Sequence, residues 1–173
     1  GQMQPALAGQ LADVGHIDAC FITHGHVDHT GSLSFLNEAV PLYATPVTCA
    51  LLRAVEETQA SPGPEDGITD FILRPNLGQP NHGRRALLDL PGPDTFPDCR
   101  VTPFPVDHSI PGACAYLVEW DGGSLVYTGD LRFHGRMGDR TRSSMEALTA
   151  AHPDHLIIEG TNLKPDAETQ EHG

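Results

Sequence analysis

Residues 23–31, with the sequence THGHVDHTG, are the feature that most constrains what this chain can fold into. On an extended backbone the side chains of His24 and His26 point the same way, so both can reach one metal ion. Asp28 and His29 begin the next predicted helix and face a second point nearby. Imidazole nitrogen and carboxylate oxygen are ligands of catalytic zinc sites. A lone histidine would be read as a surface residue and a lone Asp28 as a helix cap, but the four together predict a metal centre.

Hydrophobic periodicity around this motif alternates between helix and strand, which predicts an α/β fold. A stretch rich in proline and glycine over residues 61–98 interrupts the alternation, and it is expected to hold one or two short strands. Pro103 and Pro105 predict an edge strand, because proline cannot donate a hydrogen bond to a neighbouring strand. The Asp121-Gly122 pair predicts a tight hairpin. We expect helices over residues 5–14, 30–40, 46–59 and 143–151, and strands over residues 17–23, 41–44, 100–106, 113–120, 124–128 and 154–159, the last of them buried.

The chain is strongly acidic, and its charge limits how it can bind nucleic acid. Ten Lys and Arg oppose 23 Asp and Glu in 173 residues, which gives a net charge of −13. Nucleic-acid-binding surfaces are normally basic. A polyanionic ligand would therefore need a local positive site, which metal ions can build. Histidine is the outlier, with ten residues, as many as Lys and Arg together.

Cysteine usage and hydropathy indicate a protein of a reducing compartment. Cys20 and Cys114 lie in apolar strand patterns, so we expect small buried side chains and no disulfide framework. No apolar run approaches the roughly 20 residues that span a bilayer. We therefore expect a cytoplasmic location and no membrane partner. The length fits a single domain.

Three later segments complete a pattern that resembles a known family. Residues 104–113, FPVDHSIPGA, contain His108, and residues 126–136, VYTGDLRFHGR, contain Asp130. With the first motif they resemble the metallo-β-lactamase fold superfamily. These segments and LIIEGTN at residues 156–162 are similar to the β-CASP nuclease branch, which includes ribonuclease J and the endonucleases that process pre-mRNA 3′ ends. The resemblance runs from about residue 5 to residue 163.

The resemblance implies a partial αββα metallo-β-lactamase sandwich over residues 1–163, with residues 164–173 as a polar tail at the start of an absent β-CASP cap. It also implies two Zn²⁺ ions per complete site. Such ions lower the pKa of water to about 7, and Asp28 would orient that water or accept its proton. Glu159 ends a strand at the same end of the sheet and is a second candidate catalytic carboxylate. The implied metal ligands are His24, His26 and His108 for one ion and Asp28, His29 and Asp130 for the other, with Asp130 shared and the last nitrogen ligand expected beyond the chain.

Substrate contacts are expected close to these motifs. His134 lies four residues past Asp130, and arginines flank it on both sides. Arginine suits bidentate contacts with phosphate, although a solvated loop would show the same pattern. The candidate substrate-binding residues are Ser109, Arg132, His134, Arg136 and Thr161.

The resemblance implies zinc-dependent hydrolysis of phosphodiester bonds, with RNA as the expected substrate. The alternatives are a DNA exonuclease of the same branch that takes single strands, a thioester or lactone hydrolase of the wider superfamily, and a non-catalytic scaffold subunit. The acidic charge favours the small-molecule hydrolase, whereas the later motifs oppose it. The intact ligand set opposes the scaffold. Without the cap and the last ligand, we expect this chain by itself to be an impaired nuclease, and its oligomeric state stays open.

Overall fold

The computed structural model describes residues 17–31, 33, 36, 39–58 and 86–160. The predicted helix over residues 5–14, Thr161 and the tail lie outside these ranges. The described elements are, in chain order, β1 (Cys20–Ile22), α2 (Val27–Thr30), β2 (Leu42–Ala44), α3 (Pro46–Thr58), β3 (Leu87–Asp89), β4 (Asp94–Thr95), β5 (Cys99–Pro105), β6 (Cys114–Trp120), β7 (Gly123–Tyr127), α4 (Gly138–Ala150) and β8 (His155–Ile157).

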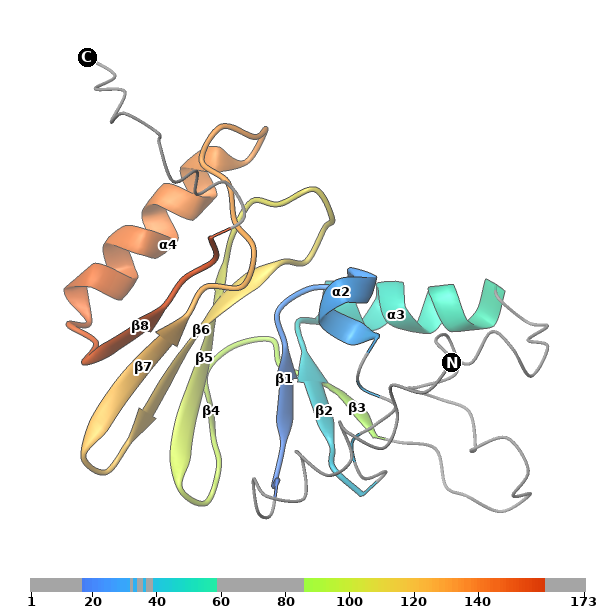
Figure 1. Ribbon diagram of the computed structural model, residues 1–173, viewed down its shortest axis with the longest axis horizontal. Helices are drawn as coiled ribbons and strands as arrows, with labels where there is room; N and C mark the ends of the chain where they lie inside the picture. The colour runs from blue at the N-terminus through green and yellow to red at the C-terminus, as the bar shows by residue number, and fades with distance from the viewer. Residues whose placement is uncertain (1–16, 32, 34–35, 37–38, 59–85, 161–173) are drawn as a thin grey trace.

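Two sheets face each other between helices (Figure 1). The first is parallel with the order β1-β2-β3, and α3 lies along it. The second has the order β4-β5-β6-β7-β8, antiparallel except for the β7–β8 pair, and α4 lies against it. The expected α/β class is confirmed. Among the described residues no helix is long and apolar enough to cross a membrane.

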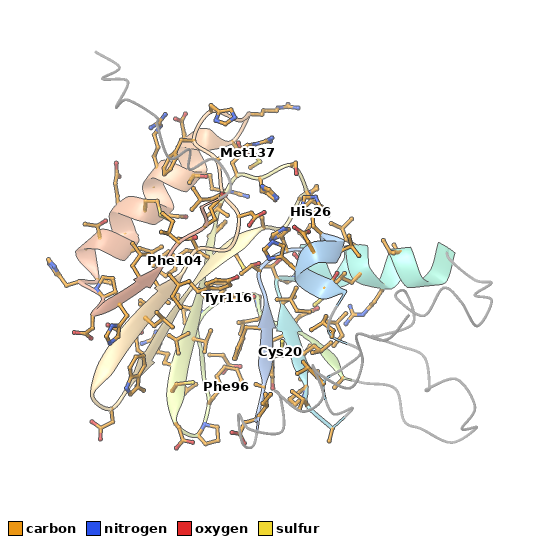
Figure 2. All side chains as sticks on the ribbon, in the orientation of Figure 1. Cys20, His26, Phe96, Phe104, Tyr116 and Met137 are labelled. Carbon is orange, nitrogen blue, oxygen red and sulfur yellow. The ribbon has the colours of Figure 1, made fainter. Side chains whose placement is uncertain are left out.

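Three apolar clusters separate the layers, and β6 shows how period-two alternation builds them. Cys114, Tyr116 and Val118 join the cluster between the two sheets, whereas Ala115 and Leu117 join the cluster beneath α4. Figure 2 shows Tyr116 between the two sheets. The cluster between the first sheet and α3 contains Ile22, Leu33, Leu42, Ala44, Cys49, Leu52 and Leu87. The molecule is therefore a sandwich of helix, sheet, sheet and helix.

Several predicted elements are confirmed. Strands β2, β6 and β7 and helix α3 lie where the sequence pattern puts them, and β1 is shorter than the predicted strand over residues 17–23. The hairpin turns at Asp121 and Gly122, where Gly122 has a φ of 126°. Two short strands, β3 and β4, lie in the described part of the predicted excursion. None of the four cysteines forms a disulfide, and Cys114 is buried and Cys20 half-buried.

Two predicted helices differ from the structure, one in its existence and the other in its first residue. The helix expected over residues 30–40 is wrong, because α2 ends at Thr30 and the described residues from 31 to 40 lie outside any α-helix. The Thr30 hydroxyl donates to the His26 carbonyl at 2.9 Å, and the glycine and serines that follow are weak helix formers. Helix α4 begins well before residue 143, at Gly138. Its start is fixed by the Asp107 carboxylate, which accepts the N–H of Met137 at 3.0 Å and places negative charge at the helix N-terminus.

Two strands differ from their expected environments. The predicted edge strand, β5, lies between β4 and β6. Because β4 pairs only with Arg100 and Val101, Pro103 and Pro105 lie beyond its end, where β5 has β6 as its one described neighbour. The strand expected to be buried, β8, is exposed, with Leu156 at 60% and Ile157 at 51%. An apolar run predicts a strand but does not reveal whether another layer covers it.

Candidate metal centre

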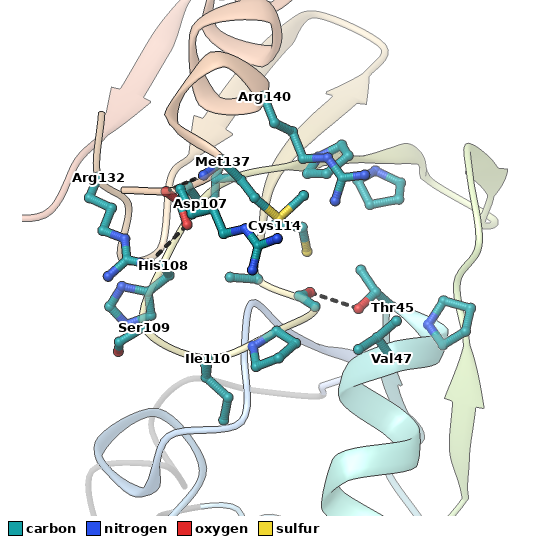
Figure 3. Close-up of a pocket in the computed structure, with 18 of the residues that line it drawn as sticks. Thr45, Val47, Asp107, His108, Ser109, Ile110, Cys114, Arg132, Met137 and Arg140 are labelled. Carbon is teal, nitrogen blue, oxygen red and sulfur yellow. Dashed lines mark hydrogen bonds and ion pairs between the residues drawn. The ribbon is translucent and has the colours of Figure 1, made fainter. Parts of the chain in front are cut away.

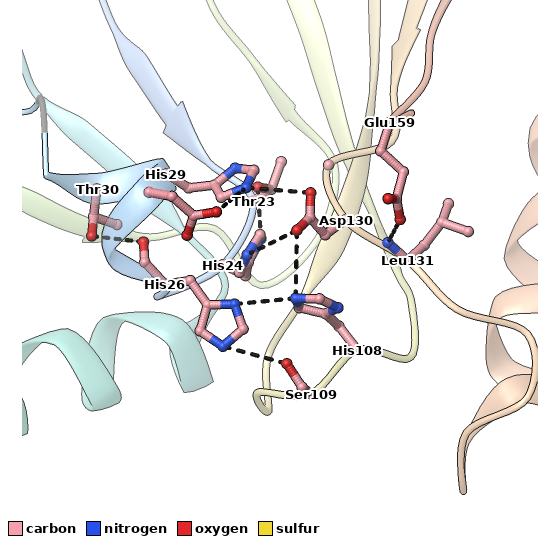
Figure 4. Close-up of polar contacts among 12 residues, drawn as sticks. Thr23, His24, His26, His29, Thr30, His108, Ser109, Asp130, Leu131 and Glu159 are labelled. Carbon is pink, nitrogen blue, oxygen red and sulfur yellow. Dashed lines mark hydrogen bonds and ion pairs between the residues drawn. The ribbon is translucent and has the colours of Figure 1, made fainter. Parts of the chain in front are cut away.

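Three separate chain segments bring five of the six predicted metal ligands together (Figure 4). His24 and His26 follow β1, and His29 lies in α2. His108 follows β5 and Asp130 follows β7. The ends of strands from both sheets therefore meet at this point.

The ligand atoms form two groups around Asp130. The nitrogens of His24, His26 and His108 lie within 4.8 Å of one another, as do the ligand atoms of His24, His29 and Asp130. One Asp130 oxygen, Oδ1, lies 3.3 Å from His29 Nε2. Its other oxygen, Oδ2, lies 3.7 Å from His108 Nε2 and 4.0 Å from His24 Nε2. The carboxylate therefore lies between His29 on one side and His108 and His24 on the other, where two neighbouring cations could both reach it.

The surroundings of His24 favour a neutral imidazole that could bind a metal ion. It is 0% exposed, and its Nδ1 contacts the Thr23 hydroxyl at 3.1 Å. Its Nε2 is buried without a hydrogen-bond partner among the described residues. Burial, together with the neighbouring imidazoles of His29 and His108, lowers the pKa of His24 to about 4. Burial also lowers the pKa of His108. Neutral imidazoles offer lone pairs, so this donor set fits a divalent cation such as zinc.

The backbone at Gly129 brings Asp130 close to His24. Gly129 has a φ of 54°, and a Cβ there would lie 2.7 Å from the Thr23 side chain. Only glycine allows this close approach of the β7 end to the β1 end. The glycine before Asp130 is therefore a structural requirement of the centre.

Asp107, which the sequence did not single out, ties the His108 segment to the Asp130 loop. Its side chain is 5% exposed, and Oδ1 pairs with Arg132 Nη2 at 3.1 Å. Its backbone carbonyl accepts the Arg132 N–H at 2.9 Å, and its own N–H donates to the Thr141 hydroxyl at 2.7 Å. The hydrogen bond from Arg132 holds the pKa of Asp107 below its usual value. The one sequence signal was its position next to His108.

A profile of the β-lactamase superfamily domain matches residues 1–172. The chain belongs to this superfamily. Three curated relatives of this β-lactamase-fold domain are nucleases. Ribonuclease J 1 of Streptococcus pyogenes is 30% identical over 70% of this chain and 19% of its own length. Ribonuclease J of Mycobacterium tuberculosis is 29% identical over 95% and 28%, and the 5′ exonuclease Apollo of Rattus norvegicus is 32% identical over 84% and 23%. The domain thus spans less than a third of each of these relatives.

Solved structures agree on the fold. A protein of unknown function from Enterococcus faecalis has a TM-score of 0.64 and 29% identity, over 86% of this chain and 34% of that one. Rm3 metallo-β-lactamase has a TM-score of 0.55 and 17% identity, over 88% of this chain and 62% of that one. The second likeness shows the fold alone.

The two candidate catalytic carboxylates, Asp28 and Glu159, lie outside the two ligand groups. Asp28 is also the predicted ligand that these groups do not include. Asp28 is 71% exposed on its side chain, and its Oδ2 lies 3.6 Å from His29 Nε2. The half-buried Glu159 uses Oε1 to accept the Leu131 N–H at 2.8 Å. It is thus hydrogen-bonded to the residue that follows Asp130.

The described candidate substrate residues lie in different places: one at the rim of the centre, two at a neighbouring cavity and one at neither. Ser109 Oγ lies 3.4 Å from His26 Nε2, at the rim of the centre. Arg132 and Arg136 line a cavity beside His108, and Arg132 is held by Asp107. His134 is exposed and does not line that cavity.

Proposed function

We propose that this domain is a zinc-dependent phosphodiesterase that acts on RNA. The observation that carries the proposal is the position of Asp130, with one oxygen beside His29 and the other beside His108 and His24. Such an arrangement suits two cations held a short distance apart, which is the arrangement that phosphodiester hydrolysis uses. The nuclease relatives support nucleic acid as the substrate class.

In the proposed reaction, each residue of the centre would bind metal, accept a proton or position another residue. His24, His26 and His108 would hold one zinc ion, and His29 with Asp130 would contribute to a second. Bound zinc would supply a nucleophilic water at neutral pH and stabilise the charge that develops on the phosphate. Asp28, exposed beside His29, would accept the proton of the attacking water. Glu159 would hold Asp130 in place through the Leu131 N–H rather than touch the substrate.

The test combines metal content with hydrolysis. Zinc per chain is measured by elemental analysis, and cleavage is followed on a 5′-labelled RNA, on a DNA of the same sequence and on bis-p-nitrophenyl phosphate. We expect Asp130→Asn to lose hydrolysis and at least one zinc. Asp139→Asn, on the exposed first turn of α4, is the matched control and should retain both.

The outcomes separate the alternatives. Folded wild-type protein that takes up no zinc, or cleavage that survives in Asp130→Asn, would refute the proposed centre. A DNA exonuclease is the second candidate function, since an exonuclease, Apollo, is among the relatives, and faster cleavage of the DNA would select it. Turnover of a thioester or lactone without cleavage of either nucleic acid would assign the site to small molecules.

A further inference from the structure

A cavity of about 530 Å³ lies beside the candidate metal centre (Figure 3). The segment after β5 forms one wall, the first turn of α3 another, and the loop before α4 with its first turn a third. His108 and Ser109 belong to its lining, and both also lie at the metal centre. A ligand in the cavity would therefore sit against the His108 side of the centre. Its volume lies within the usual range for small-molecule sites.

One side of the cavity is apolar. Val47 from α3, Leu90 after β3 and Ile110 after His108 line it, with Pro91 and Pro103 beside them. Val47 is 49% exposed, although Cys49 and Leu52 of the same helix are buried in the cluster against the first sheet. This surface offers apolar contact, which suits the face of a nucleobase.

The other side of the cavity is cationic. Arg132, Arg136 and Arg140 line it, and Asp107 is the one acidic residue of the lining. Because Asp107 is paired with Arg132, its charge is compensated. Arg136 and Arg140 are exposed and make no ion pair with any described residue. A chain of net charge −13 thus places two guanidinium groups that no described residue pairs with at one cavity, next to the candidate metal centre.

We propose that this cavity binds one nucleotide of the nucleic acid chain, next to the phosphodiester bond that is cleaved. The phosphate of that nucleotide lies against Arg136 and Arg140, and its base or sugar lies against the wall of Val47 and Ile110. Guanidinium groups match phosphate oxygens in geometry and charge. A bare phosphate would not use the apolar wall, and an uncharged metabolite would not use the arginines. The inference rests on the proposed function, since it takes the substrate to be a nucleic acid.

Binding is tested without metal, so that the cavity is separated from the centre. Uridine 5′-monophosphate, uridine and inorganic phosphate are each titrated into the protein in the presence of a chelator, by calorimetry and by methyl and amide NMR. We expect the monophosphate to bind at least about tenfold more tightly than either fragment, since a hydrogen bond to a charged group contributes about a factor of ten or more. The shifted signals should include Val47, Ile110 and Met137.

Variants then assign the two walls. Arg136→Ala with Arg140→Ala should raise the Kd for the monophosphate about tenfold, to the value for uridine. Arg142→Ala is the matched control, because Arg142 lies on the same helix, pairs with Asp139 and does not line the cavity. Val47→Asp should abolish binding while keeping the helix, since an acidic residue is favourable in a first turn.

Four results would overturn the inference. They are no saturable binding of the monophosphate, equal affinity for uridine or phosphate, shifts confined to other parts of the molecule, and an unchanged Kd in the double arginine variant. A short RNA should also displace the monophosphate, and its failure to do so would assign the cavity to free nucleotides instead. Monophosphate binding in a protein that shows no zinc-dependent hydrolysis would uphold the cavity and refute the proposed function alone.

Discussion

The buried imidazole of His24 predicts that acid destabilises the metal-free protein over a defined pH range. Its pKa is about 4 in the folded chain, against 6.5 for an ordinary histidine. Between these pH values His24 is protonated in the unfolded chain but neutral in the folded chain, so the free energy of unfolding falls as the pH falls. The contribution is fully present above pH 6.5 and fully lost below pH 4.

The magnitude follows from the difference between the two pKa values. One pKa unit corresponds to about 1.4 kcal/mol, so the full shift represents about 3 kcal/mol of unfolding free energy. At pH 5 the loss relative to pH 7.5 is about 2 kcal/mol. Other buried groups add to it, and the lowered pKa of His108 acts in the same direction.

The assay is urea unfolding of chelator-treated protein at pH 7.5 and pH 5, for wild type, His24→Asn and His134→Asn. The His24 variant should lose about 2 kcal/mol of the pH dependence, whereas the variant at the exposed His134 should keep it. Direct NMR titration of the His24 ring needs no variant. A ring that titrates near 6.5 in the folded, metal-free protein would refute the reasoning.

Two further substitutions test the packing that supports the centre. Tyr116→Phe removes a buried hydroxyl that donates to the Ile22 carbonyl at 2.9 Å, and it should cost about 1–2 kcal/mol of unfolding free energy; Tyr127→Phe, at an exposed position, should cost almost nothing. Gly129→Ala forces a Cβ against Thr23 at a φ of 54°, so we expect a loss of about 2 kcal/mol or more together with lower zinc content. A Tyr116→Phe variant with the unfolding free energy of the wild type would contradict the first assignment. A Gly129→Ala variant with the unfolding free energy and zinc content of the wild type would contradict the second.

The fold was predictable where local patterns decide it. Helix α3 begins at a proline and keeps one apolar face, and the hairpin of β6 and β7 turns at Asp121-Gly122. The errors arise where distant contacts decide. Helix α4 begins early because a carboxylate from another segment accepts the N–H of Met137. Strand β8 lies at the edge of the sheet formed by the described strands, and its apolar side chains are exposed, which its own residues do not reveal.

The metal centre shows the same division between local and distant information. The clustered histidines could be predicted as ligands because these residue types at this spacing suit few roles other than metal binding. The residues that position them, Thr23, Asp107 and Gly129, could not be predicted, because their roles arise only where the strand ends meet. Asp107 positions the centre through its contacts with Arg132 and Thr141, and both residues lie far from it in the sequence.

The support at Thr23 also explains why a buried nitrogen of His24 can be left unpaired. An unpartnered polar atom in the interior is costly unless a ligand binds it. When Nδ1 donates its proton to the Thr23 hydroxyl, 3.1 Å away, the lone pair of the neutral ring lies on Nε2. That atom is the one without a partner, and it faces Asp130 at 4.0 Å. In this tautomer the hydrogen bond holds the ring with its Nε2 lone pair toward Asp130, where a bound cation would relieve the cost of the unpaired nitrogen.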